Sequence, residues 1–439
     1  MGLFGLFKKK EEPIAEVKEE KYEYKTHMIY GEQLKNTLDS VKEFEKRDCY
    51  DQLKNFLFSN MTDRVCLVYG LRRTGKTIMM RQAMLEMSDE DREKCAYIKI
   101  TINDDMKALN EDFKQLRKDG FKYVFIDEIT LLDDFVDNAA ILSDIYAAEG
   151  MKIVLSGTDS LAFWYTVRGE LYDRAVQIHT TFISYSETKR LLKKDDFDEY
   201  IREGGTLSPS PLFADIDATS NYIDTSIVRN IRRSVKGSEE MDGQILQVME
   251  AIAYNYVLAA LNDKNASYDF HVSARYLKNQ QENKFKLDTT IVNQIRDYLK
   301  AIDCTTLIND SNRLVFTQPG MMYSKVEAII DELMTDRHYV SMSDVERVVF
   351  LGNLHGAVLM MLRDDYGSLD ENSYKVKIEE PVEVSEEPVA EDKPEASEEV
   401  QETETAEVTE DTEATESVEA SENSDTVTEE KADANADNG

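Results

Sequence analysis

A glycine-rich segment that ends in a lysine and a threonine has the clearest chemical pattern in this sequence. Residues Gly70–Thr77 read Gly-Leu-Arg-Arg-Thr-Gly-Lys-Thr, a complete G-x-x-x-x-G-K-[ST] loop. Glycines let the chain approach an anion without Cβ collisions, so that successive backbone N–H groups can surround phosphates. Lys76 can then reach the β- and γ-phosphates, and the Thr77 hydroxyl can ligate Mg²⁺. The loop therefore predicts a nucleoside triphosphate site.

Two adjacent carboxylates, Asp127 and Glu128, follow the apolar run 123–126. A strand that ends in this way places its first carboxylate near the metal and its second where it can polarise an attacking water. An Asp-Glu pair indicates hydrolysis, because a protein that only stores a nucleotide needs no base. We therefore predict that Thr77 and Asp127 are the metal ligands and that Lys76 and Glu128 are catalytic.

Three further polar residues are candidates for the same site. Ser156 and Thr158 follow the apolar run 153–155, where a hydroxyl could sense the γ-phosphate; Thr158 is slightly favoured, and a simple turn is the alternative. Arg174 precedes another run, and its guanidinium could stabilise charge on the transferring phosphate. It could serve its own site, serve a neighbouring chain, or form only a salt bridge. The predicted nucleotide-binding residues are Gly70, Arg73, Thr74, Gly75, Lys76, Thr77, Ile78 and Thr158.

Short apolar runs that alternate with helical patterns position these residues. Continuous apolar runs of this kind indicate a parallel sheet covered on both faces, with ligands at the carboxyl ends of its strands. The fold class is therefore α/β, a P-loop NTPase with a parallel five-stranded sheet. The five predicted strands are 65–69, 96–102, 123–126, 153–155 and 175–178.

The stretch from Val65 to about residue 207 resembles the prokaryotic AAA-type ATPases that carry a glycine-lysine loop preceded by paired arginines. The resemblance rests on residues 70–77, 123–128, 155–158, 172–174, 180–187 and 198–205. It implies that the core binds ATP with Mg²⁺, that the last two stretches lead into a helical lid, and that the site residues have the family's roles. Those residues are Lys76, Thr77, Asp127, Glu128 and Arg174. Many members continue into a nuclease-like domain, which we do not expect here because an acidic tail follows 341–365.

Composition defines that tail and the remaining organisation. Of the chain's net charge of −35, most comes from residues 376–439, which hold 24 acidic residues and three lysines, with no aromatic residue, leucine or methionine. Such a segment cannot bury enough apolar surface to fold, so we predict disorder. The predicted parts are a disordered segment 1–28, an ATPase core 29–190, a helical lid 191–265, a winged-helix-like domain 266–340, a C-terminal helix 341–365 and the tail 366–439.

The cysteines and the apolar runs bear on the compartment. The four cysteines lie far apart in sequence without a CxxC pair, which argues against zinc clusters and disulfides and favours a reducing cytoplasm. No apolar run reaches about 18 residues, so we expect no transmembrane segment. Residues 1–7 are apolar and precede three lysines, which is the reverse of a secretory signal; they form a frayed end or a short membrane-surface anchor.

Two segments after the core raise the question of nucleic acid. Residues 226–236 place Arg229, Arg232, Arg233 and Lys236 on one helical face, which is either a phosphate-facing stripe or a solvated face. Residues 289–302 read as a helix followed by a hairpin over 305–317, the outline of a winged helix. Its basic residues are outnumbered by aspartates, a poor balance for DNA.

We therefore expect an AAA-type ATPase that hydrolyses Mg-ATP to drive a rearrangement of its lid or of a protein partner, with oligomerisation open. One alternative is a nucleotide-switched DNA-binding regulator with slow hydrolysis, which is less favoured. Another is an interaction scaffold in which the acidic tail engages a basic partner.

Overall fold

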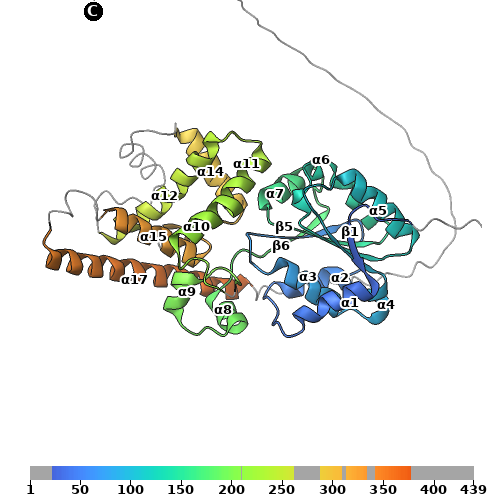
Figure 1. The fold of residues 1–439 in the computed structure, drawn as a ribbon, viewed down its shortest axis with the longest axis horizontal. Helices are drawn as coiled ribbons and strands as arrows, with labels where there is room; N and C mark the ends of the chain where they lie inside the picture. Colours follow the sequence, from blue (N-terminus) through green and yellow to red (C-terminus); the bar gives the residue numbers. More distant parts are fainter. Residues whose placement is uncertain (1–21, 209, 262–286, 309–312, 334–341, 377–439) are drawn as a thin grey trace, which may run out of the picture. The chain divides into compact units, whose positions relative to one another are not determined.

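The computed structural model describes residues 22–208, 210–261, 287–308, 313–333 and 342–376. Most of the predicted tail, all of 1–21 and the segment 266–286 that opens the predicted winged-helix domain lie outside these residues. The N-terminal half contains one six-stranded sheet, in the order β1-β3-β4-β5-β2-β6 (Figure 1). The strands are β1 (His27–Tyr30), β2 (Val65–Tyr69), β3 (Cys95–Lys99), β4 (Tyr123–Asp127), β5 (Lys152–Gly157) and β6 (Ala175–His179).

Strands β2 to β6 are mutually parallel and correspond to the five predicted strands. The count of five is nevertheless too low, because β1 adds a sixth strand that pairs antiparallel with β3. This edge strand has only four residues, His-Met-Ile-Tyr, and all of them are half-buried or exposed. Its extended conformation depends on pairing with β3, which a local sequence pattern does not report.

Helices cover both faces of the sheet (Figure 1). Alternate residues of β2 enter the two layers: Val65 and Leu67 pack with α5, α6 and α7, whereas Cys66 and Val68 pack with α1, α2 and α3. The helices of this half are α1 (Gly31–Leu38), η1 (Asp39–Val41), α2 (Tyr50–Phe58), α3 (Lys76–Leu85), α4 (Asp89–Glu93), α5 (Met106–Lys118), η2 (Ile129–Leu131), α6 (Phe135–Asn138), η3 (Leu142–Ala147) and α7 (Ser160–Arg168).

The rest of the described chain is helical around its own apolar core. The predicted helix and hairpin are present: α14 is followed by the antiparallel pair β7-β8. The elements are α8 (Tyr185–Leu192), α9 (Phe197–Glu203), α10 (Ile216–Ile223), η4 (Asp224–Val228), α11 (Arg229–Val235), α12 (Glu240–Ala260), α14 (Thr289–Ala301), β7 (Thr305–Ile308), β8 (Arg313–Phe316), α15 (Pro319–Leu333) and α17 (Asp344–Val376).

Helix α17 extends past the expected end at residue 365 and into the region predicted as tail. Tyr366 is buried and donates a hydrogen bond to the carbonyl of Phe316, which keeps the chain helical beyond that point. Over residues 344–370 this helix is long and apolar enough to cross a membrane by length and composition, a weak criterion that core helices also meet. Four of its apolar side chains are buried in the fold, Leu354, Val358, Leu362 and Tyr366, and others that are partly buried pack against the same core.

Candidate nucleotide site

The glycine-lysine loop lies at the carboxyl end of β2, where its backbone packs closely against the segment that follows β6. It connects β2 to α3, and its two glycines have positive φ angles, 148° at Gly70 and 90° at Gly75. A Cβ on Gly70 would lie 2.6 Å from the hydroxyl of Thr180, so no other residue fits there without displacing that neighbour. Gly75 precedes the first turn of α3, whose first three residues line the pocket described below, and the N–H groups of a helix's first turn have no partner within the helix.

Lys76 is nearly buried, with 6% of its surface exposed. Its Nζ donates to the carbonyl oxygens of Gly70 and Leu71, both at 2.8 Å. Burial lowers the pKa of Lys76 to about 8, and the carboxylates of Glu128 and Asp127 oppose that shift. An anion that entered the loop would add further negative charge beside this amine and favour its protonated form.

Asp127 ends β4 and lies under the loop, 2% exposed. Its Oδ2 accepts hydrogen bonds from Thr77 Oγ1 at 2.9 Å and from Tyr97 Oη at 2.7 Å, and its Oδ1 accepts from Ser156 Oγ. The predicted Thr77–Asp127 pair is therefore formed. Ser156 serves this carboxylate, whereas the neighbouring candidate Thr158 reaches Glu128. Tyr97 was not predicted, since a tyrosine within an apolar strand also reads as core.

Glu128 has a left-handed backbone, with φ at 61°, which turns its side chain away from the direction that β4 would give it. Its Oε2 accepts from Thr158 Oγ1 at 2.6 Å and from the Thr158 backbone N–H at 3.2 Å. The predicted base and the predicted phosphate sensor thus contact each other directly, across the ends of two neighbouring strands.

The loop, Glu128 and Thr158 line one pocket of about 830 Å³, whereas Asp127 lies behind Thr77 and is not part of the lining. It contains every predicted nucleotide-binding residue except Gly70, together with Glu128. Two residues of the loop after α9, Leu207 and Ser208, close one side and were not predicted. The backbone N–H of Leu207 donates to the carbonyl of Arg73 at 2.8 Å, and Arg73 Nη1 donates to Ser208 Oγ at 3.1 Å. The lining residues are Arg72, Arg73, Thr74, Gly75, Lys76, Thr77, Ile78, Glu128, Thr158, Leu207, Ser208 and Ser210.

Arg174 lies apart from this pocket. Its carbonyl accepts a hydrogen bond from the N–H of Val65, the first residue of β2, whereas the glycine-lysine loop follows the last. Arg174 is therefore at the amino ends of the strands, and its guanidinium pairs with Asp144. A catalytic role at its own chain's site does not fit this position; the salt bridge is the alternative that the structure contains.

Three of the four basic residues on the predicted face of α11, all of them arginines, have acidic partners. Arg229 pairs with Asp224 at 2.7 Å, Arg232 with Asp242 at 3.0 Å and Arg233 with Asp133 at 2.7 Å. Arg233 also donates to the carbonyl of Leu131, in the turn that follows the acid pair. Arg233 therefore joins α11 to the turn after β4, and the three paired arginines offer little unbalanced charge to nucleic acid, whereas Lys236 is exposed.

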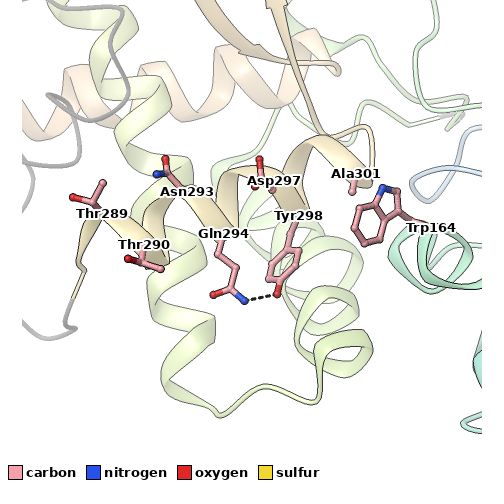
Figure 2. A pocket seen from close by; sticks show the side chains of 8 residues that line it. All are labelled: Trp164, Thr289, Thr290, Asn293, Gln294, Asp297, Tyr298 and Ala301. Atoms are coloured by element: carbon pink, nitrogen blue, oxygen red, sulfur yellow. Dashed lines mark hydrogen bonds between the residues drawn. The ribbon is translucent and has the colours of Figure 1, made fainter. Parts of the chain in front are cut away.

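The surface of α14 is equally unsuited to a phosphate backbone. Figure 2 shows a pocket of about 610 Å³ along this helix, with Trp164 beside Ala301 at one end. Its polar lining consists of hydroxyl and amide groups and the carboxylate of Asp297. Gln294 Nε2 donates to Tyr298 Oη at 2.6 Å, and Arg168 Cζ lies 3.7 Å from the centroid of Trp164.

Comparisons with known proteins agree with the position of the site. Residues 62–189 match a family model described as an AAA domain. No curated protein matches the sequence. Solved structures that are similar include the Walker-type ATPase PABY2304 of Pyrococcus abyssi, with 13% identity, 64% of this chain and 95% of that chain covered, and a TM-score of 0.41.

Two further similar structures also come from archaea. The ORC2 protein of Aeropyrum pernix, solved with ADPNP and ADP, has 12% identity, covers 70% of this chain and 96% of its own, and gives a TM-score of 0.38. CDC6P from Pyrobaculum aerophilum has 15% identity, covers 67% and 98%, and gives 0.28. The family match covers the loop, the acid pair and the strands that position them: residues 62–189 are an AAA domain of the AAA-type P-loop ATPase family.

Proposed function

We propose that this chain binds ATP with Mg²⁺ and hydrolyses it, and that hydrolysis drives a rearrangement of the helical lid or of a protein partner. One observation supports this above the others: Lys76, Thr77, Glu128 and Thr158, which come from three separate strand ends, line a single pocket. A structural role alone would not require a phosphate-binding loop and a general base to meet there.

The ligand set suits magnesium. The Thr77 hydroxyl and the Asp127 carboxylate are 2.9 Å apart, and both are oxygen donors. In the described part of the chain, no group of three or more histidine, cysteine or acidic residues could hold a metal by itself. Mg²⁺ typically takes only one or two protein oxygens and completes its shell with phosphates and water. When bound, it would neutralise charge on the β- and γ-phosphates.

Glu128 is placed to act on water. As water attacks the γ-phosphorus, a new P–O bond forms, the bond to the bridging oxygen breaks, and the carboxylate of Glu128 accepts a proton from the water. In the structure this carboxylate accepts the Thr158 hydroxyl proton instead. Because a hydroxyl has one proton to donate, a γ-phosphate that accepts it from Thr158 frees the Glu128 oxygen for water.

The helical lid is hydrogen-bonded to the loop Gly70–Thr77. Besides the contacts of Leu207 and Ser208, the Tyr222 hydroxyl on α10 donates to the carbonyl of Arg72 at 3.1 Å. Gln318, at the start of α15, donates from Nε2 to the Tyr222 oxygen at 3.1 Å. A shift of the loop on hydrolysis would therefore move the α9–α10 segment and, through Tyr222, the helices beyond it.

Steady-state ATP turnover in the purified chain tests this function. Glu128→Gln keeps the shape and the hydrogen bond from Thr158 but removes the base, so we expect ATP binding to remain while turnover falls by about 10²- to 10⁴-fold. Glu170→Gln, on the exposed loop after α7, is the matched control and should turn over ATP at the wild-type rate. Equal turnover in Glu128→Gln and the wild type would remove Glu128 from the mechanism.

A further inference from the structure

A buried arginine that belongs to no recognised motif lies beneath the phosphate-binding loop. Arg47 precedes α2, and its side chain is 5% exposed. All five of its N–H groups have acceptors. Nε and Nη2 donate to the two carboxylate oxygens of Glu187 at 2.6 and 3.1 Å, and Nη2 also donates to the carbonyl of Phe182 at 3.0 Å. Nη1 donates to the carbonyls of Thr180, at 3.0 Å, and Thr74.

The contact with Thr74 is a contact with the loop itself. Thr74 directly precedes Gly75, and a Cβ on Gly75 would lie 3.6 Å from Cδ of Arg47. The aliphatic part of Arg47 therefore lies against the loop, and its guanidinium fixes the direction of one loop carbonyl. The Thr74 hydroxyl is held as well, since it donates to the carbonyl of Leu71 at 2.9 Å and lies 2.7 Å from the hydroxyl of Thr180.

The other end of the contact is on the first helix after the sheet. Glu187 is 3% exposed and lies in α8, where its Oε1 also accepts the backbone N–H of Asp48 at 2.7 Å. Ser184 caps the same helix and accepts from the N–H of Glu187 at 3.1 Å. One guanidinium thus joins the loop, the end of β6 and α8 in a single buried cluster.

We propose that Arg47 is a positioning residue of the nucleotide site, which holds the loop in the shape that directs its N–H groups at phosphate. The hydrogen bond from Arg47 fixes the carbonyl of Thr74, and the N–H of Gly75 in the same peptide group therefore points the opposite way, toward the pocket. A loop of backbone N–H groups binds an anion only when several of them converge on it. Lysine cannot replace this arrangement, because a single ammonium cannot reach the acceptors that the planar fork reaches. This inference rests on the proposed function, because it concerns how the same pocket binds its nucleotide.

A matched pair of substitutions separates positioning from general stability. Arg190 lies on α8, as Glu187 does, and joins this helix to the segment around Arg47. Its Nη2 donates to Asp48 Oδ1 at 2.6 Å, and its Nη1 donates to the carbonyl of Lys46 at 2.7 Å. None of these acceptors belongs to the loop. Arg47→Lys and Arg190→Lys therefore make the same chemical change between the same segments, and only the first removes contacts to Thr74.

The experiment measures the Kd of Mg-ATP and the melting temperature of the full chain and of both variants. We expect Arg47→Lys to raise the Kd by about tenfold or more, the effect of losing a charge-assisted hydrogen bond, and Arg190→Lys to change it by less than about threefold. If Arg47→Lys fails to fold, Glu187→Gln provides a second test, because it removes the negative charge and replaces one of the two oxygens that hold the guanidinium with an NH2 group, which cannot accept.

The outcomes discriminate between the two proposals. If the wild type binds no Mg-ATP, the proposed function is wrong. If the wild type binds and folded Arg47→Lys binds equally well, or if Arg190→Lys weakens binding to the same extent, only the positioning role of Arg47 is wrong. A lower melting temperature in Arg47→Lys with an unchanged Kd also contradicts it, since that is the result expected of a purely structural cluster.

Discussion

The two charged residues at the centre of the site, Asp127 and Lys76, lie in different surroundings. Three donors point at the carboxylate of Asp127, from Thr77, Tyr97 and Ser156, so both of its oxygens are held in place. The amine of Lys76 is buried against carbonyl groups, and its pKa falls from 10.5 to about 8. The site therefore has a carboxylate that is already oriented for the proposed Mg²⁺ and a lysine whose protonated form an anionic ligand would favour.

This pKa predicts how nucleotide binding depends on pH. Below pH about 8 Lys76 is protonated and attracts phosphate, whereas above that pH the free protein loses the proton and binding must take one up. We expect the Kd of Mg-ATP to rise as the pH increases from about 8 toward 10, by up to about tenfold per unit. Calorimetry in buffers of different ionisation enthalpy would report the proton uptake directly.

Lys76→Arg is the control for this prediction, because a guanidinium stays protonated throughout this range. Its Kd, even if higher at every pH, should not rise between about pH 8 and 10. A wild-type Kd that stays flat over the same range would show that Lys76 keeps its charge without nucleotide, and the assignment of the lowered pKa would be wrong.

The sequence pattern predicted the site residues whose types and spacing are unusual, but not the buried residues that contact them. The loop and the acid pair could be predicted because glycines, a lysine and carboxylates rarely follow apolar runs at these spacings outside a nucleotide site. Tyr97 and Arg47 could not, because a tyrosine in a strand and an arginine before a helix are common. Their positions depend on the pairing of β3 with β4 and on the contact of Arg47 with Thr74, which are tertiary contacts that the local sequence does not show.

At the scale of elements, α17 is held to the hairpin by a buried ion pair. Arg313 on β8 donates to both carboxylate oxygens of Asp365 at 2.7 Å, and the Tyr256 hydroxyl on α12 donates to Asp365 Oδ2 at 2.6 Å. Asp365 is 2% exposed. A second pair on α17, between Arg363 and Asp198, is largely exposed and joins the same helix to α9.

The two pairs should differ strongly in their contribution to stability. Arg313→Met leaves the Asp365 carboxylate buried beside fewer donors, and we expect it to lower the free energy of unfolding by about 3–5 kcal/mol. Arg363→Met removes a pair exposed to water, and we expect at most about 1 kcal/mol. Urea denaturation of the two variants measures both values; similar losses would mean that the buried pair does not anchor α17.

The elements also show where local pattern is sufficient. Strands β2 to β5 were predictable because almost every residue in them is buried, so that each reads as a continuous apolar run. The edge strand β6 is half-buried or exposed at four of its five positions and gives a weaker pattern. By contrast, β1 and the last third of α17 owe their structure to partners: β1 pairs with β3, and Tyr366 reaches the carbonyl of Phe316. The loop that carries Leu207 and Ser208 into the pocket has no pattern at all and is fixed by its hydrogen bonds to Arg73.

At the scale of the whole molecule, the net charge and the ion pairs of α11 both argue against binding to nucleic acid. The net charge is −35, and the arginines of α11 that suggested nucleic acid are paired with aspartates. Because non-specific DNA binding needs unpaired positive charge against phosphates, these paired arginines do not support the hypothesis of a DNA-binding regulator. The contacts from the loop to Leu207, Ser208 and Tyr222 are the ones through which the proposed rearrangement of the helical part would take place.

The most direct test of this account is a calorimetric titration of the full chain with Mg-ATP at neutral pH, beside the same titration of Lys76→Ala. We predict one binding site per chain in the wild type and no measurable binding in the variant, whose melting temperature stays within a few degrees of the wild type. Binding of equal affinity in both proteins, or no heat with the wild type, would contradict the claim that the loop Gly70–Thr77 holds a triphosphate.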